Sequence, residues 1–261
     1  MIIFIFLICF LASVAGAICG IGGGVIIKPV LDAFKVMDVA AISFLSGCTV
    51  LSMSCYNVGR NLFSGSSENS LRTDTPLAVG AALGGIAGKY LFSAVRAAAS
   101  SPDRVGAVQA ICLGIITVGT LLYTLMRSRI RTHETKNLFL CLLIGLALGI
   151  MSSFLGIGGG PINLIVLSYF FSMPTKKAAQ SSLYIILFSQ VASLLTSILT
   201  RTVPSFEIGT LLCMIAGGIG GGIVGRLLNR KMKESAVDRL FQILMIIIIG
   251  ICVWNAVQYM A

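Results

Sequence analysis

The stretch Gly20-Ile21-Gly22-Gly23-Gly24 decides the fold, because it returns as Gly156-Ile157-Gly158-Gly159-Gly160 and each copy interrupts a long apolar region. The interrupted regions, residues 2–34 and 137–172, are much longer than an average helix of about three to four turns. Each glycine in a helix interior disfavours the helix by about 1 kcal/mol relative to alanine. We therefore expect each region to form a discontinuous helix, bent or folded back at its glycines.

The glycine motif is part of a longer internal repeat. Two further pairs of segments match at nearly the same displacement of 136 positions: Gly84-Gly85-Ile86-Ala87-Gly88-Lys89 with Gly221-Gly222-Ile223-Val224-Gly225-Arg226, and Asp103-Arg104-Val105 with Asp238-Arg239-Leu240. Similar segments at a fixed spacing are the signature of a duplicated unit. The sequence predicts a first repeat over residues 1–130 and a second over residues 131–261, each opening with its broken helix.

The composition places these repeats in a membrane. Of the 261 residues, 57% are hydrophobic and only 11% are charged, whereas soluble domains carry about 25% charged residues. Polar residues divide the chain into eight apolar regions long enough to span a bilayer, four in each repeat: 2–34, 39–58, 76–95, 105–126, 137–172, 178–199, 208–228 and 237–259. This pattern excludes a soluble enzyme, a disordered chain and a nucleic-acid-binding module. It predicts an all-α polytopic protein in the lipid bilayer of a cell membrane, the bacterial inner or plasma membrane.

The positive charges leave two topologies open. The 19 lysines and arginines give a net charge of +10, and such residues gather in cytoplasmic loops. Eight full crossings divide them 12 against 7 between the two sides. If both broken regions fold back, the division is 13 against 6 with the linker 127–136 inside, and the repeats are inverted. Broken helices in corresponding positions favour the inverted arrangement, which is typical of secondary transporters.

The glycine motifs are the first candidate site. Irregular backbone at membrane depth is tolerated only where protein buries it or where it lines a cavity. The half-helix after each motif presents free N–H groups and a partial positive charge, which suit a small anion. We assign this binding role to Gly20, Gly22, Gly23, Gly24, Gly156, Gly158, Gly159 and Gly160. For Gly80, Gly84, Gly88 and the cluster at residues 217–225, we expect close helix packing instead.

Neutral polar side chains form the second candidate surface. Hydroxyls and amides donate hydrogen bonds to an oxyanion without the desolvation cost of a full charge. The candidates are Ser46, Thr49, Asn163, Gln180, Ser181, Ser182 and Tyr184. Hydrogen bonding between helices explains any single one of them equally well. Lys28, in the apolar run after the first motif, either faces the substrate path or reaches the membrane interface beside Asp32.

Several kinds of chemistry lack candidates in the sequence. All nine acidic residues lie in or next to loops, so we expect none in the interior and no proton relay built on carboxylates. The single histidine, His133, lies in the basic linker. Neither a cluster of metal ligands nor a nucleophile with its base occurs. The sequence therefore indicates no metal, no cofactor and no enzymatic activity, and it favours anions over cations as the transported species.

Eight cysteines leave an alternative of a different class open, a membrane-embedded thiol-redox carrier of the DsbD kind. Such a carrier needs two cysteines that face each other from corresponding positions, but Cys19 corresponds to Leu155. Most of the cysteines lie within apolar runs, which is typical of small buried hydrophobic residues.

Two copies of Gly-Ile-Gly-Gly-Gly, the first followed by Pro29, occur together with Thr175-Lys176-Lys177-Ala178-Ala179-Gln180-Ser181-Ser182-Leu183. This combination resembles the TauE/SafE sulfite exporter family, also called the TSUP family of anion transporters, and the resemblance covers essentially the whole chain. It implies transport of sulfite, of organosulfonates such as sulfoacetate, or of other small sulfur-containing or organic anions, usually outward. The second repeat has Ile165 where the family's proline is expected, and Pro161 directly after the glycines. We therefore expect the two halves of the site to contact substrate differently.

The leading hypothesis is thus a secondary anion transporter that works by alternating access between its two repeats. The glycine motifs present helix ends to the anion, and the neutral side chains supply further hydrogen-bond donors.

Overall fold

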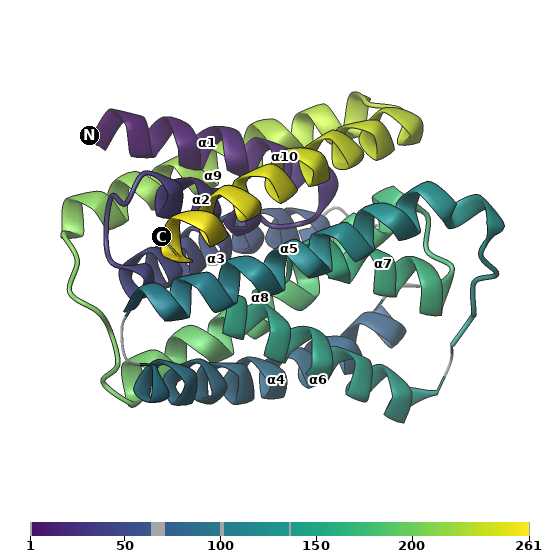
Figure 1. Cartoon of the computed structure of the whole chain (residues 1–261). Coiled ribbons are helices and arrows are strands. Elements are labelled where there is room, and N and C mark those ends of the chain that lie inside the picture. Colours follow the sequence, from purple (N-terminus) through teal and green to yellow (C-terminus); the bar gives the residue numbers. More distant parts are fainter. Residues whose placement is uncertain (1, 64–70, 100–101, 136, 261) are drawn as a thin grey trace.

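Figure 1 shows a computed structural model of the protein, which describes residues 2–63, 71–99, 102–135 and 137–260. The described residues form helices joined by loops, which confirms the all-α class. Eight helices are long and apolar enough to cross a membrane, so the protein is a multi-pass membrane protein as predicted. The α-helices are α1 (Ile2–Cys19), α2 (Gly24–Ala33), α3 (Val39–Phe63), α4 (Leu71–Ala98), α5 (Pro102–Met126), α6 (Leu138–Leu155), α7 (Gly160–Phe171), α8 (Thr175–Leu199), α9 (Ile208–Lys231) and α10 (Glu234–Met260).

The first broken region folds back on itself as a hairpin of α1 and the short helix α2. Its turn is closed by the N–H of Ile21, which donates to the carbonyl oxygen of Gly16 at 3.1 Å. Phe4 near the start of α1 and Phe34 just after α2 then meet edge to face, with 5.1 Å between ring centroids. The chain therefore enters and leaves this hairpin at the same end of the protein.

The second broken region forms a similar hairpin of α6 and the short helix α7. The N–H of His133 donates to the carbonyl oxygen of Tyr169 at 2.7 Å, and the N–H of Thr135 donates to that of Phe170 at 2.9 Å. These bonds join the segment before α6 to the end of α7. Of the two expected forms, bent or folded back, both regions adopt the second.

Each hairpin packs most extensively on a helix of the other half of the chain, α1 on α9 and α6 on α4. Glycines allow this approach, because a Cβ at Gly80 or Gly84 would lie 2.2 Å from the carbonyl oxygen of Leu142 or Leu146. The expected packing role of these glycines is confirmed, and Gly221 has the same role against the carbonyl oxygen of Phe10.

Adding a methyl group to this helix contact is expected to destabilise the protein. Gly84→Ala places its Cβ against the α6 backbone, which cannot move aside as a flexible side chain does, so we expect a loss of roughly 1–3 kcal/mol. Gly250→Ala is the matched control, because a Cβ there meets nothing within 4 Å. Thermal unfolding of the two purified variants measures the difference, and equal unfolding temperatures would contradict this packing role.

The helix ends gather at two opposite ends of the bundle. At the end that holds both chain termini (Figure 1), Arg96 at the end of α4 lies 3.9 Å from Asp38 in the loop after α2. At the opposite end, Arg127 after α5 donates to the hydroxyl of Thr175 at the start of α8, at 2.8 Å. We call these the terminal end and the linker end, since the second holds the segment that joins α5 to α6.

Candidate functional site

The two glycine loops, residues 20–23 and 156–159, meet inside the bundle. A Cβ at Gly22 would lie 3.4 Å from the carbonyl oxygen of Gly158, and one at Gly24 would lie 2.5 Å from that of Ile157. Gly22 and Gly158 have φ angles of 70° and 77°, in the left-handed region that side chains with a Cβ rarely adopt. Backbone thus touches backbone here, and glycine is required both by conformation and by space.

Both loops are held by the same two helices, α3 and α8. Gly20 packs on Ala179 of α8, and Gly156 packs on Ser43 of α3. Positions 43 and 179 are separated by the same displacement as the two glycine motifs. The loops therefore have matching surroundings, in which each is supported by a helix of the other half.

Three of the predicted neutral side chains lie beside these loops. Asn163 of α7 and Ser46 of α3 are fully buried, next to Gly159 and Gly24 respectively. The amide nitrogen of Asn163 donates to the hydroxyl of Ser182, at 3.3 Å. The Oδ1 atom of Asn163 and the hydroxyl of Ser46 have no protein partner. Buried polar groups are normally hydrogen-bonded. These two unpaired atoms are therefore candidates for contact with a ligand.

The other predicted side chains lie elsewhere. Thr49 donates to the carbonyl oxygen of Leu45 in its own helix, at 2.9 Å. Ser181 donates to the carboxylate of Asp74, at 2.9 Å. The ring of Tyr184 packs on Phe188, with 5.0 Å between centroids. Hydrogen bonds and packing within the protein therefore account for these three.

Lys28 does not line the contact between the glycine loops. It is 3% exposed, and its ammonium donates to the side-chain oxygen of Gln109 on α5. The expectation that acidic residues stay out of the interior is wrong for Asp32 and Asp74, which are only 7% and 5% exposed. Both lie near helix ends in the sequence, but the helices around those ends cover them.

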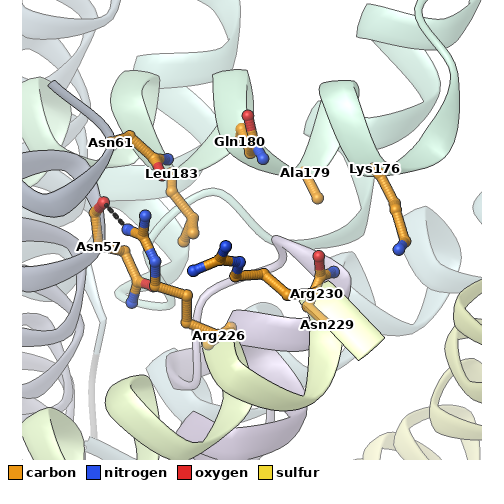
Figure 2. Close-up of a pocket in the computed structure, with 10 residues that line it drawn as sticks. Asn57, Asn61, Lys176, Ala179, Gln180, Leu183, Arg226, Asn229 and Arg230 are labelled. Carbon is orange, nitrogen blue, oxygen red and sulfur yellow. Dashed lines mark hydrogen bonds between the residues drawn. The ribbon is translucent and has the colours of Figure 1, made fainter. Parts of the chain in front are cut away.

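A basic cavity of about 260 Å³ lies at the linker end, beside the first glycine loop. Its inner wall includes Ala17 at the end of α1 and Ala179, the residue on which Gly20 packs. Figure 2 shows the guanidinium groups of Arg226 and Arg230 reaching into it from α9. Among the described residues, its polar lining consists of Asn57, Asn61, Lys176, Gln180, Arg226, Asn229 and Arg230, none of which is acidic. We call it the linker-end cavity.

Sequence reasoning found only Gln180 among these polar residues. The signal available was the spacing of four between Asn57 and Asn61 and between Arg226 and Arg230, which places each pair on one helix face. Arg226 donates to the carbonyl oxygen of Asn57 at 2.8 Å, which joins the ends of α9 and α3 (Figure 2).

A second, smaller cavity of about 20 Å³ lies toward the terminal end, beside the second glycine loop. Its lining includes Lys89, whose ammonium lies 5.2 Å from the centroid of the Phe92 ring. Six residues that line it stand 136 or 137 positions from residues that line the linker-end cavity, so they occupy equivalent positions in the two repeats. The pairs are Ser43 and Ala179, Lys89 and Arg226, Phe92 and Asn229, Ser153 and Ala17, Ser193 and Asn57, and Ser197 and Asn61. We call it the terminal-end cavity.

These features are typical of a multi-pass membrane transporter: two hairpins, whose longer arms are two of the eight helices of spanning length, meet next to a polar cavity. The family model of the sulfite exporter TauE/SafE matches residues 5–251. Because the match covers nearly the whole chain, the protein belongs to the TauE/SafE sulfite exporter family.

One curated relative is the Bacillus subtilis (strain 168) protein described as "Probable membrane transporter protein YunE". It is 27% identical over 105 residues, which are 40% of this chain. The aligned segment spans 37% of the relative's own length. No solved structure matches the chain.

Proposed function

We propose that the protein is a secondary transporter that exports small anions, such as sulfite, organosulfonates or related sulfur-containing or organic anions. It works by alternating access between two inverted repeats. The observation that carries this proposal is the pair of corresponding cavities beside the joined glycine loops. One of them has room for an anion of several atoms, whereas the other has room for about one water molecule.

The two hairpins support the proposed inversion. Each hairpin returns to the end at which it began, so only three helices of each half, α3 to α5 and α8 to α10, carry the chain across. An odd number of crossings places the second half upside down relative to the first. The two cavities then lie on opposite sides of one central site, as alternating access requires.

The charges orient this arrangement. With folded-back hairpins, 13 of the 19 lysines and arginines belong, by their place in the sequence, to the linker end. Basic residues gather on the cytoplasmic side, so the larger cavity opens to the cytoplasm. An exporter must take up its substrate there.

The lining favours anions. Lys176, Arg226 and Arg230 supply positive charge at the entrance, and a cleft lined by one sign of charge concentrates ions of the opposite sign. Further in, the starts of α2 and α7, with the hydroxyl of Ser46, offer N–H and O–H donors without a counter-charge. The anion therefore moves from a charged entrance to a neutral site that it can leave.

A thermal-shift screen of the purified protein tests the anion class. We expect at least one of sulfite, sulfate, thiosulfate, sulfoacetate and short carboxylates to raise the unfolding temperature, and choline chloride at equal ionic strength to leave it unchanged. Flux of the stabilising anion in proteoliposomes then tests transport. No stabilisation and no flux with any of these anions would contradict the proposal.

Alternating access predicts different labelling of two corresponding positions. In a cysteine-free variant, Asn61→Cys lies at the wider cavity and Ser197→Cys lies at the smaller one, where Ser197 is 1% exposed. We expect a membrane-impermeant maleimide to label Asn61→Cys rapidly from the cytoplasmic side, and Ser197→Cys only during transport and from the other side. Labelling of both from the same side would contradict the model. Transport by the cysteine-free variant would also exclude the thiol-redox alternative.

A further inference from the structure

A buried polar cluster lies apart from the glycine loops, between α2, α5 and α10. Its members are Lys28 and Asp32, one turn apart on α2, with Gln109 of α5 and Asn255 of α10. All four are at least nine-tenths buried. Burying a lysine and an aspartate inside a protein is unfavourable even when they are close together, so stability does not explain this cluster.

Two acceptor atoms of the cluster are unsatisfied. Asn255 donates its amide to the carbonyl oxygen of Pro29 at 2.8 Å, but its own Oδ1 atom has no partner. The Oδ1 atom of Asp32 also has none. Both residues line the same small cavity, of about 10 Å³. A proton on the Asp32 carboxyl would give this cavity the hydrogen-bond donor that its two acceptors lack.

Within the described residues, a charged pair one turn apart on the short hairpin helix occurs in the first half and not in the second. At the repeat displacement, Leu164 and Ser168 stand where the first half has Lys28 and Asp32, and they line a corresponding small cavity between α5, α7 and α10. The cation and the carboxylate that line this second cavity, Arg127 and Asp238, both come from outside α7. The first half differs because its two charged groups belong to the short helix of the hairpin itself.

The cluster is connected to the second glycine loop. Lys28 donates to Gln109, and Gln109 donates to the carbonyl oxygen of Phe154 at 2.6 Å. Phe154 lies two residues before Gly156 and forms part of the wall of the terminal-end cavity. A change in charge beside Lys28 thus reaches both hairpins, because Lys28 belongs to the first and Phe154 to the second.

We propose that Asp32, beside Lys28, is a proton-binding site that couples anion transport to a proton gradient, an inference that rests on the proposed function. A proton from water binds the carboxylate on one side of the membrane and leaves on the other. When the proton binds, Lys28 loses its negative neighbour. The hydrogen bonds that link Lys28 through Gln109 to the carbonyl oxygen of Phe154 then change.

The charges near Asp32 favour a proton over a metal cation. The titratable groups that act on it are Lys28, Asp38 beyond the end of α2, and Cys252 of α10, while α5 contributes the neutral Gln109. A sodium ion would meet one carboxylate inside the cavity and an ammonium beside it. A proton needs only the carboxylate.

The test uses proteoliposomes and labelled sulfoacetate, with the membrane potential clamped. If one proton moves per anion, a gradient of one pH unit in the driving direction is expected to give about tenfold accumulation by the wild type. We expect Asp32→Asn to abolish this accumulation and to retain exchange of labelled for unlabelled sulfoacetate at equal pH. Asp32→Glu keeps the carboxylate and is expected to restore accumulation. Glu207→Gln is the control, since it neutralises an exposed carboxylate just before α9 that does not line this cavity.

Three accumulation results would overturn the proton site. In the first, Asp32→Asn accumulates as much sulfoacetate as the wild type. In the second, accumulation by the wild type does not depend on the pH gradient in either direction. In the third, accumulation depends on a sodium gradient instead. Loss of exchange together with accumulation in Asp32→Asn and in Asp32→Glu would assign the residue to structure and also overturn it. Absence of sulfoacetate exchange in the wild type would instead count against the proposed function.

Discussion

Gly158→Leu is expected to reduce anion flux in proteoliposomes to less than about a hundredth of the wild-type rate, because displacement of a binding group by about 1 Å can cost that much. Gly158 has a φ of 77°, which disfavours leucine. Its Cβ would lie 2.5 Å from a methyl carbon of Val50. The substitution therefore displaces the second loop from Val50 of α3, the side chain beside which the two loops meet.

The matched control is Gly119→Leu. Gly119 lies on the outer face of α5, and a Cβ there meets nothing within 4 Å. We expect this variant to transport normally and to unfold at the wild-type temperature. Gly22→Leu addresses the other loop and is expected to fail as Gly158→Leu does. Normal flux in both loop variants would contradict the assignment of the site.

The positions of the glycine loops could be predicted from the sequence, because the need for glycine there arises from the local backbone. A left-handed φ and contact between two backbones both demand glycine, so residue type alone marked the breaks at residues 20–24 and 156–160. The direction of the chain after each break was not predictable. It depends on contacts between distant residues, such as the one between the rings of Phe4 and Phe34.

The linker-end cavity was not predictable for a similar reason. Its cations come from α8 and α9, and its amides come largely from α3 and α9, segments that lie far apart in the sequence. Taken by themselves, Arg226 and Arg230 are basic residues near the end of a membrane helix, a pattern that is common at a cytoplasmic interface. Only the meeting of these helix ends gives the two arginines a shared cavity.

The burial of Asp32 could not be predicted from its position in the sequence. It is near the end of α2 and next to a loop, which in an ordinary spanning helix places a residue at the membrane surface. However, α2 is the short inner arm of a hairpin, and α5 and α10 cover its last turn. The rule that polar residues near loops are solvated therefore fails where neighbouring helices cover the end of a short one.

The double variant Arg226→Gln, Arg230→Gln is expected to raise the KM for a transported anion by roughly 100-fold, with a smaller effect on the maximal rate. A hydrogen bond to a charged group contributes about 1.5–3 kcal/mol, and each 1.4 kcal/mol corresponds to about a tenfold change in affinity. The two guanidinium groups reach into one cavity (Figure 2), and none of its described lining residues is acidic. Their removal therefore lowers both the attraction of the anion and its binding.

Lys231→Gln is the matched control for this variant, because it removes a positive charge from an exposed residue at the same helix end that does not line the cavity. Transport measured at several salt concentrations distinguishes attraction of the anion by the charges of this cavity from an effect of the overall charge of the protein. Salt screens exposed charges over about 10 Å at 0.1 M, so we expect the wild-type KM to rise with salt and that of the double variant to respond much less. An unchanged KM in the double variant, or an equal increase in Lys231→Gln, would show that the anion does not enter through this cavity.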